Sequence, residues 1–88
     1  CDPEVASDAF HHLRPEPGVL GKEVTPLQSW PKVPMAYIVC TEDRTATPQW
    51  AMRAGRERLG VEPMVIAGGH CPMLSRPKEL AKVLARCA

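Results

Sequence analysis

Two short apolar runs stand out in the second half of the chain, and each predicts a strand. Residues 36–41 and residues 62–67 are rich in β-branched and other large apolar side chains, without a regular polar alternation. Such runs are typical of strands that are buried on both faces, as in a parallel sheet. We therefore expect two neighbouring parallel strands, each followed by a polar or glycine-rich loop.

A helical pattern follows each of these runs. Residues 47–59 open on a Thr-Pro pair that suits a helix start, and Gly60 ends the segment. Residues 77–86 repeat apolar side chains at i, i+3, i+4 and i+7, which predicts a helix with one buried stripe. The order strand, helix, strand, helix over residues 36–88 is that of a parallel sheet covered by helices. The stripe expected to be buried consists of Leu80, Val83, Leu84 and Cys87.

The first part of the chain predicts one helix and a long connection. An Asp-Pro-Glu start and apolar residues at i, i+4 and i+8 indicate a helix over residues 2–14, which two prolines stop. Residues 15–35 hold five of the ten prolines and predict an extended connection, with a short strand over 24–27. Two strands alone leave apolar edges exposed, so we expect the chain to be part of a larger α/β fold.

Composition narrows the classes of function. The 88 residues are 44% hydrophobic and 24% charged with a net charge of +1, which argues against a basic nucleic-acid binder and an acidic disordered tail. No apolar run approaches the roughly 20 residues that span a bilayer, and no signal peptide is visible. The four cysteines form no Cys-x-x-Cys pair, so we expect reduced thiols, no metal and no cofactor, in a cytoplasmic protein without a membrane or nucleic-acid partner.

Reactive side chains follow both predicted strands. Glu42 and Asp43 come after the first strand, and His70 follows Gly68 and Gly69 after the second. Because the carboxyl ends of parallel strands meet at one edge of a sheet, we expect a carboxylate and the imidazole to meet there. A carboxylate that holds one imidazole N–H fixes the tautomer and stabilises the protonated ring, as nucleophilic catalysis requires. Asp43 is the preferred partner of His70, with Glu42 as the alternative.

Three stretches of the chain carry a family resemblance: residues 37–43 (Tyr-Ile-Val-Cys-Thr-Glu-Asp), residues 68–80 with the run His-Cys-Pro-Met-Leu-Ser-Arg-Pro, and residues 1–15. They resemble the α/β-hydrolase family, whose triad runs Ser, then Asp or Glu, then His. The closer resemblance is to the branch of plant-type methylesterases and hydroxynitrile lyases. It implies an α/β fold in which residues 1–35 are the end of the cap region and a connection. Residues 36–88 are then the C-terminal part of the core, with its last two parallel strands.

The resemblance also implies roles for individual residues. Asp43 is the triad acid, His70 is the general base, and Met73 and Leu74 lie beside the substrate pocket, although both also fit a simple core role. The lyases carry a Lys directly after the catalytic His, whereas this chain carries Cys71, which favours ester hydrolysis over cyanohydrin cleavage.

The nucleophile is the main departure from the family pattern. The serines are Ser7, Ser29 and Ser75, and none lies in a Gly-x-Ser-x-Gly motif. We therefore expect the C-terminal portion of a serine hydrolase of carboxylesterase type, inactive alone, whose N-terminal portion supplies the serine. The expected partners are that portion and a small-molecule ester, with homo-oligomerisation left open. The alternative is a non-catalytic binding or interaction module that retains the hydrolase layout.

Overall fold

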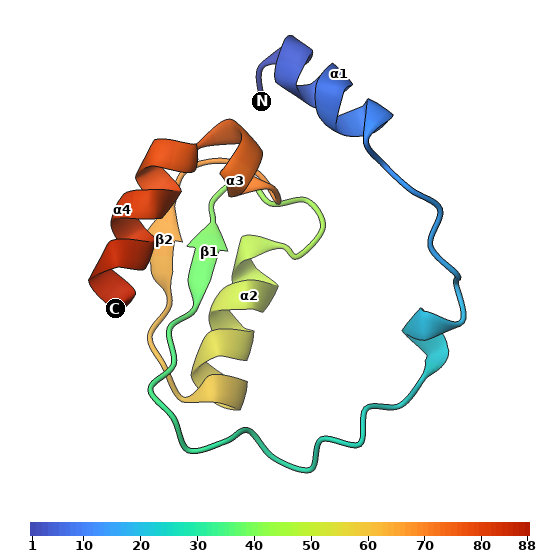
Figure 1. The fold of residues 1–88 in the computed structure, drawn as a ribbon. Coiled ribbons are helices and arrows are strands. Elements are labelled where there is room, and N and C mark those ends of the chain that lie inside the picture. Colours follow the sequence, from blue (N-terminus) through green and yellow to red (C-terminus); the bar gives the residue numbers. More distant parts are fainter.

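The two predicted strands pair in parallel, in a computed structural model that describes residues 1–88. β1 (Ile38–Cys40) and β2 (Met64–Ile66) form a two-stranded sheet whose register sets Val39 opposite Val65. Each strand is shorter than the apolar run that predicts it. The crossover between the strands runs through a helix, as the predicted order of elements requires (Figure 1).

Backbone hydrogen bonds continue this pairing beyond both strands toward their carboxyl ends. The amide of Thr41 donates to the carbonyl of Ile66 at 3.0 Å, and the amide of Glu42 donates to the carbonyl of Gly68 at 3.0 Å. The loops that follow β1 and β2 therefore leave the sheet side by side. This edge carries the reactive side chains.

The helices after the strands begin and end close to their predicted limits. α2 (Pro48–Ala54) continues as a π-helical turn, η2 (Gly55–Leu59), and ends at Gly60. α4 (Pro77–Cys87) follows β2 after a short helix, α3 (Pro72–Ser75), that the sequence pattern did not predict. The longest helix has 11 residues, and no helix has the length and apolar character needed to cross a bilayer.

Gly55 lies where the crossover helix packs closest to its neighbours. A Cβ atom at this position would lie 2.7 Å from Pro63 Cγ and 2.8 Å from Tyr37 Cδ1. Real Cβ contacts are longer than this, so any larger residue forces the end of the helix away from the segments that flank the strands.

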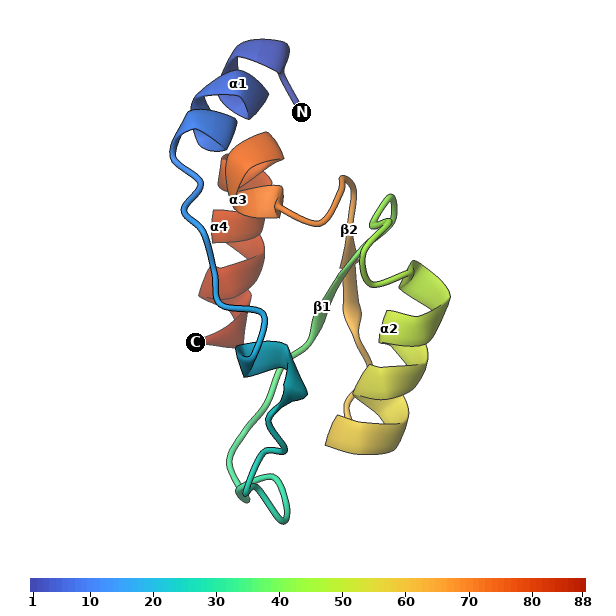
Figure 2. The ribbon, with the colours of Figure 1, turned by 90° about the vertical axis from the view of Figure 1, so that its right-hand side faces the viewer.

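The core consists of residues on both faces of the sheet. Because side chains alternate along a strand, Val39 and Cys40 point to opposite faces, and both are buried. Cys40, Ile66 and Val83 of α4 form one cluster, while α2 contacts β1 and buries Ala51. α2 and α4 thus cover opposite faces of the sheet (Figure 2).

Fewer apolar residues of α4 and β2 are buried than the sequence pattern predicts. In α4 only Val83 is buried and Leu80 is half-buried, whereas Leu84 and Cys87 are exposed, contrary to expectation. Val65 of β2 is also exposed, so β2 is not buried on both faces. The reason is the same for all three: a sheet of two strands is too narrow to cover the whole apolar surface of its strands and helices.

The N-terminal helix forms as predicted but is shorter. α1 (Pro3–His11) starts at Asp2, whose Oδ1 accepts a hydrogen bond from the Glu4 amide at 2.9 Å. The helix ends three residues before the predicted limit at Arg14. Arg14 precedes Pro15, which disfavours helical backbone there, and no packing compensates because α1 has no buried residue.

An extended connection joins α1 to β1 and loops away from the sheet (Figure 1). Its only regular element is one 3₁₀ turn, η1 (Leu20–Lys22). The short strand predicted over residues 24–27 is wrong: Val24 is 93% exposed, and the segment has no neighbouring strand with which to pair.

Candidate active site

The carboxylate of Asp43 and the imidazole of His70 meet at the carboxyl edge of the sheet. Asp43 follows β1 by three residues, and His70 follows β2 by four. His70 Nδ1 lies 2.9 Å from Asp43 Oδ2, so the predicted contact between the two side chains is present. A carboxylate only accepts hydrogen bonds, which places the bonding proton on Nδ1 and leaves Nε2 as the basic nitrogen of the neutral ring.

The second oxygen of Asp43 is held by its own loop. Oδ1 accepts hydrogen bonds from the Thr45 amide at 2.8 Å and the Ala46 amide at 2.9 Å. The pKa of the Asp43 carboxyl is lowered, chiefly by the hydrogen bond from His70 and further by these two amides, although partial burial opposes them. Asp43 therefore stays ionised and oriented, with 12% of its side chain exposed against 54% for His70.

The neighbouring carboxylate does not take part in this contact. Glu42 uses its backbone amide to extend the strand pairing, and its side chain is exposed and makes no hydrogen bond to His70. The geometry thus distinguishes Asp43 from the alternative that the sequence left open.

The backbone turn that leads to His70 depends on glycine. Gly68 has a φ of 109°, a backbone conformation that residues with a side chain strongly disfavour. A Cβ atom there would also lie 3.3 Å from Arg76 Cγ. The chain can therefore turn out of β2 and bring His70 back over the end of β1.

A mostly apolar groove of about 420 Å³ adjoins the exposed His70 ring. Its walls come from α1 on one side and from α3 with the preceding loop on the other. Leu74 lines the groove, whereas Met73, which is exposed on α3, does not. The lining residues are Cys1, Ala6, Ala9, Phe10, Leu13, Gly69, His70, Cys71, Leu74 and Ser75.

Several of these groove residues were not singled out as site residues from the sequence. Phe10 and Leu13 belong to the apolar stripe of α1, and that spacing was the available signal. A stripe of this kind predicts a face that contacts something apolar, but it does not distinguish a core from a groove. The Ser75 hydroxyl, also at the groove, donates to the Cys71 carbonyl at 3.3 Å, and no serine of the chain hydrogen-bonds to His70.

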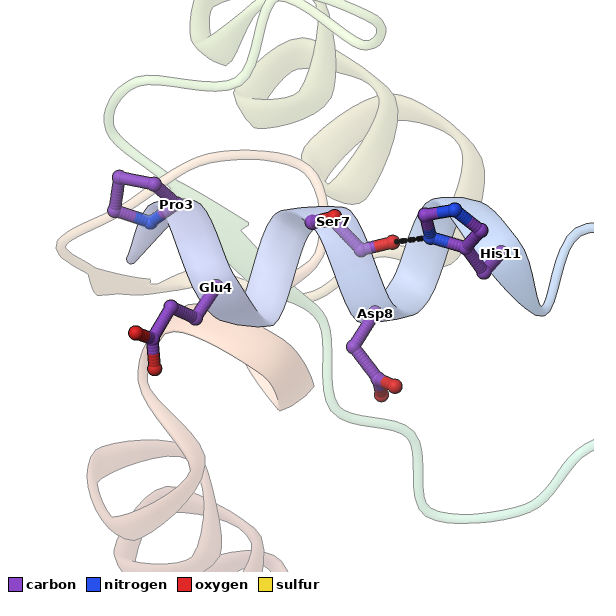
Figure 3. A pocket seen from close by; sticks show the side chains of 5 residues that line it. All are labelled: Pro3, Glu4, Ser7, Asp8 and His11. Carbon is purple, nitrogen blue, oxygen red and sulfur yellow. Dashed lines mark hydrogen bonds between the residues drawn. The ribbon is translucent and has the colours of Figure 1, made fainter.

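A second hollow, of about 500 Å³, lies on the solvent face of α1. Its lining is Pro3, Glu4, Ser7, Asp8 and His11 (Figure 3). His11 Nδ1 lies 2.7 Å from the Ser7 carbonyl oxygen, so this ring is tied to its own helix. The hollow has no hydrophobic lining and no group from the Asp43–His70 pair, and no three His, Cys, Asp or Glu side chains of the chain gather to hold a metal ion.

Comparisons with known proteins identify the family. No curated protein and no solved structure matches the chain. The model of the family described as "Alpha/beta hydrolase family" matches residues 2–83, which is nearly the whole chain and includes the pair at the sheet edge. The chain therefore belongs to the α/β-hydrolase family.

Proposed function

We propose that this chain is the C-terminal portion of a serine hydrolase of carboxylesterase type that acts on a small-molecule ester. Asp43 is the triad acid and His70 is the general base. The observation that carries the proposal is the Asp43–His70 hydrogen bond beside an apolar groove, with the Nε2 atom of a half-exposed ring free of protein partners.

The geometry supports a defined sequence of proton transfers. His70 Nε2 accepts the proton of a serine hydroxyl as its oxygen attacks the ester carbonyl carbon, and the ionised Asp43 stabilises the protonated ring. The protonated ring then gives that proton to the departing alkoxide, which leaves an acyl-serine. Water repeats the sequence, with Nε2 as base, and releases the acid and the free serine.

The nucleophilic serine is assigned to an N-terminal portion of the same hydrolase, outside these 88 residues. Ser75 is close to the groove, but its hydroxyl is bonded to a carbonyl, and Ser7 and Ser29 lie on α1 and the connection. The exposed apolar side chains of Val65 and Leu84 and the second edge of β1 fit a sheet that further strands complete. In this proposal residues 1–35 are the end of a cap and its connection, and residues 36–88 close the core.

The groove supports an ester with an uncharged, apolar group. Phe10, Leu13 and Leu74 supply apolar walls, and no lysine or arginine lines the groove to neutralise an anionic substrate. Met73 lies on the outer surface of α3 and contacts substrate only if the N-terminal portion extends the groove over it. Cys71, in place of the lysine of the lyases, supports hydrolysis over cyanohydrin cleavage.

The test is turnover of a p-nitrophenyl ester by the hydrolase that includes the N-terminal portion. His70→Ala is expected to abolish turnover, and Asp43→Asn to lower kcat by about 10⁴-fold, because the wrong tautomer is then held. Two matched controls are Glu42→Gln, the adjacent carboxylate, and His12→Ala, whose Nδ1 is bonded to the Asp8 carbonyl on α1. Both controls should retain wild-type turnover, and full activity in His70→Ala would remove His70 from the mechanism.

The non-catalytic interaction module is the second candidate, favoured by the lack of any serine bonded to His70 within the chain. The upstream sequence distinguishes the two candidates. A serine in a Gly-x-Ser-x-Gly motif between a strand and a helix supports the hydrolase, whereas a hydrolase-like upstream portion without that serine supports the module.

The isolated 88 residues should be inactive, bind the dye ANS and melt with weak cooperativity, because so much apolar surface is exposed. A sharp two-state melt would contradict the hypothesis that these 88 residues are only one portion of a larger fold.

A further inference from the structure

Two thiols from distant parts of the chain line one groove. Cys1 precedes α1 and Cys71 precedes α3, and both side chains line the groove beside His70. Both cysteines are free and exposed. The chain start lies beside α3 in both ribbon views (Figures 1 and 2).

The other two cysteines are placed differently. Cys40 is buried under α4, and this burial raises the pKa of its thiol, which lowers the reactive thiolate fraction. Cys87 is exposed at the end of α4, where its thiol is bonded to the Val83 carbonyl at 3.3 Å, and it lines a separate hollow beside the connection. Cys1 and Cys71 thus share one groove, which neither Cys40 nor Cys87 lines.

The helix next to Cys1 packs loosely on the rest of these 88 residues. α1 has no buried residue, and its main contact with another helix or strand is with α3. Cys1 lies directly before the Asp2 cap of α1, and a long extended connection follows the helix. A disulfide needs the two Cα atoms within about 7 Å, so the bond would hold this end of α1 close to the loop before α3.

We propose that Cys1 and Cys71 form a reversible disulfide that fastens α1 to α3 across the groove beside His70. The oxidant is a low-molecular-weight disulfide such as oxidised glutathione. One cysteine thiolate attacks a sulfur of the oxidant, which forms a mixed disulfide and releases one glutathione thiol. The second cysteine thiolate then attacks the protein sulfur of that bond and releases the second glutathione, so two protein thiols are oxidised and one disulfide is reduced to two thiols.

This bond changes the groove without modifying the side chains of Asp43 and His70, although Cys71 directly follows His70 in the chain. It fixes the distance between the two walls and removes the freedom of α1 to open. Access to the His70 ring then depends on the redox state of two thiols that lie at the groove itself. Excess reduced glutathione reverses the change by the same exchange steps.

The test equilibrates the full 88-residue chain with oxidised glutathione and then traps free thiols with an alkylating agent. The expected product is a monomer that has lost two hydrogens, in which the tryptic peptide with Cys1 is joined to the peptide with Cys71. Amide hydrogen exchange of α1 should slow by roughly tenfold or more in the oxidised monomer, because opening of α1 is restricted.

Three single variants separate this bond from other thiol chemistry. Cys87→Ser is the matched control, since Cys87 is exposed but lies outside the groove, and it should form the bond and slow α1 exchange as the wild type does. In Cys1→Ser and in Cys71→Ser, the reaction should end at a glutathione adduct on the remaining groove cysteine. Amide hydrogen exchange of α1 should not slow in either variant. An intramolecular bond in either of these variants, adducts alone in the wild type, or a disulfide-linked dimer would overturn the proposal.

Discussion

Similar sequence patterns in residues 1–35 and residues 36–88 give helices in both regions but buried side chains in only one of them. Both regions contain an amphipathic helix with a proline at its start, and both helices form. All eight buried residues nevertheless lie in residues 36–88, and none lies in the first region. Local spacing and capping are therefore enough to specify a helix, whereas burial requires a partner surface, which here is the β1–β2 sheet.

The largest expected effect comes from shortening a core side chain. Ile66→Ala removes contacts with Cys40 and Val83 and should cost about 2–5 kcal/mol, which a core this small does not tolerate. The same kind of truncation in the first region, Val24→Ala, should change stability by less than about 0.5 kcal/mol. Urea unfolding of the two variants within the hydrolase that includes the proposed N-terminal portion, followed by circular dichroism, measures both. Equal effects would mean that the connection packs as tightly as the sheet.

A second pair of variants compares glycines of the two regions. Gly55→Ala places a methyl group against Pro63 and Tyr37 and should destabilise the chain by about 1–3 kcal/mol. Gly18→Ala meets no atom within 4 Å and should be neutral or slightly stabilising. Thermal melts of the two variants give the comparison, and a stable Gly55→Ala protein would show that the end of the crossover helix moves easily.

Loss of the α1 cap should have a smaller and local effect. Asp2→Ala removes the side-chain acceptor of the Glu4 amide and should cost α1 about 1 kcal/mol. Because α1 buries no residue, faster amide exchange should be confined to α1, while β1 and β2 keep their protection. Accelerated exchange in the strands as well would show that the two regions unfold together.

The smallest expected effect is a pH dependence of folding stability that comes from Asp43 in residues 36–88. The pKa of Asp43 is lower in the folded chain than in the unfolded chain, so at low pH the unfolded state binds the proton first. The stabilisation is complete above the ordinary aspartate pKa of about 3.9 and is lost as pH falls through the folded pKa. The stability difference between wild type and Asp43→Asn should therefore narrow below about pH 4. A constant difference, or an equal trend in Glu42→Gln, would contradict the assignment to Asp43.

Elements that depend on neighbouring residues in the sequence could be predicted, whereas features that depend on distant parts of the fold could not. The two strands and the crossover helix have local signals, namely the apolar runs, Pro48 and Gly60, and their positions agree with the structure. α3 has four residues, too few for any periodic pattern to show, and it was missed. Burial of Leu84 and Val65 was overestimated because it depends on how many strands lie beside them, which no local pattern contains.

The candidate site divides in the same way. Parallel pairing predicts that a side chain after β1 meets one after β2, and His70 and Asp43 do meet. The choice between Asp43 and Glu42 is made by the loop, where the amides of Thr45 and Ala46 hold one carboxylate oxygen of Asp43. The groove was not predicted, since it exists only where α1 lies across from α3.

The two amide contacts to Asp43 Oδ1 do not involve His70 at all. When the ring is removed by substitution with alanine, the acid keeps its position with one oxygen still presented toward the vacated space. That oxygen is a docking point for free imidazole diffusing in from solution. Under the proposed function, the activity lost in the His70→Ala variant of the completed hydrolase is therefore expected to return, in a dose-dependent manner, as imidazole is added to the assay.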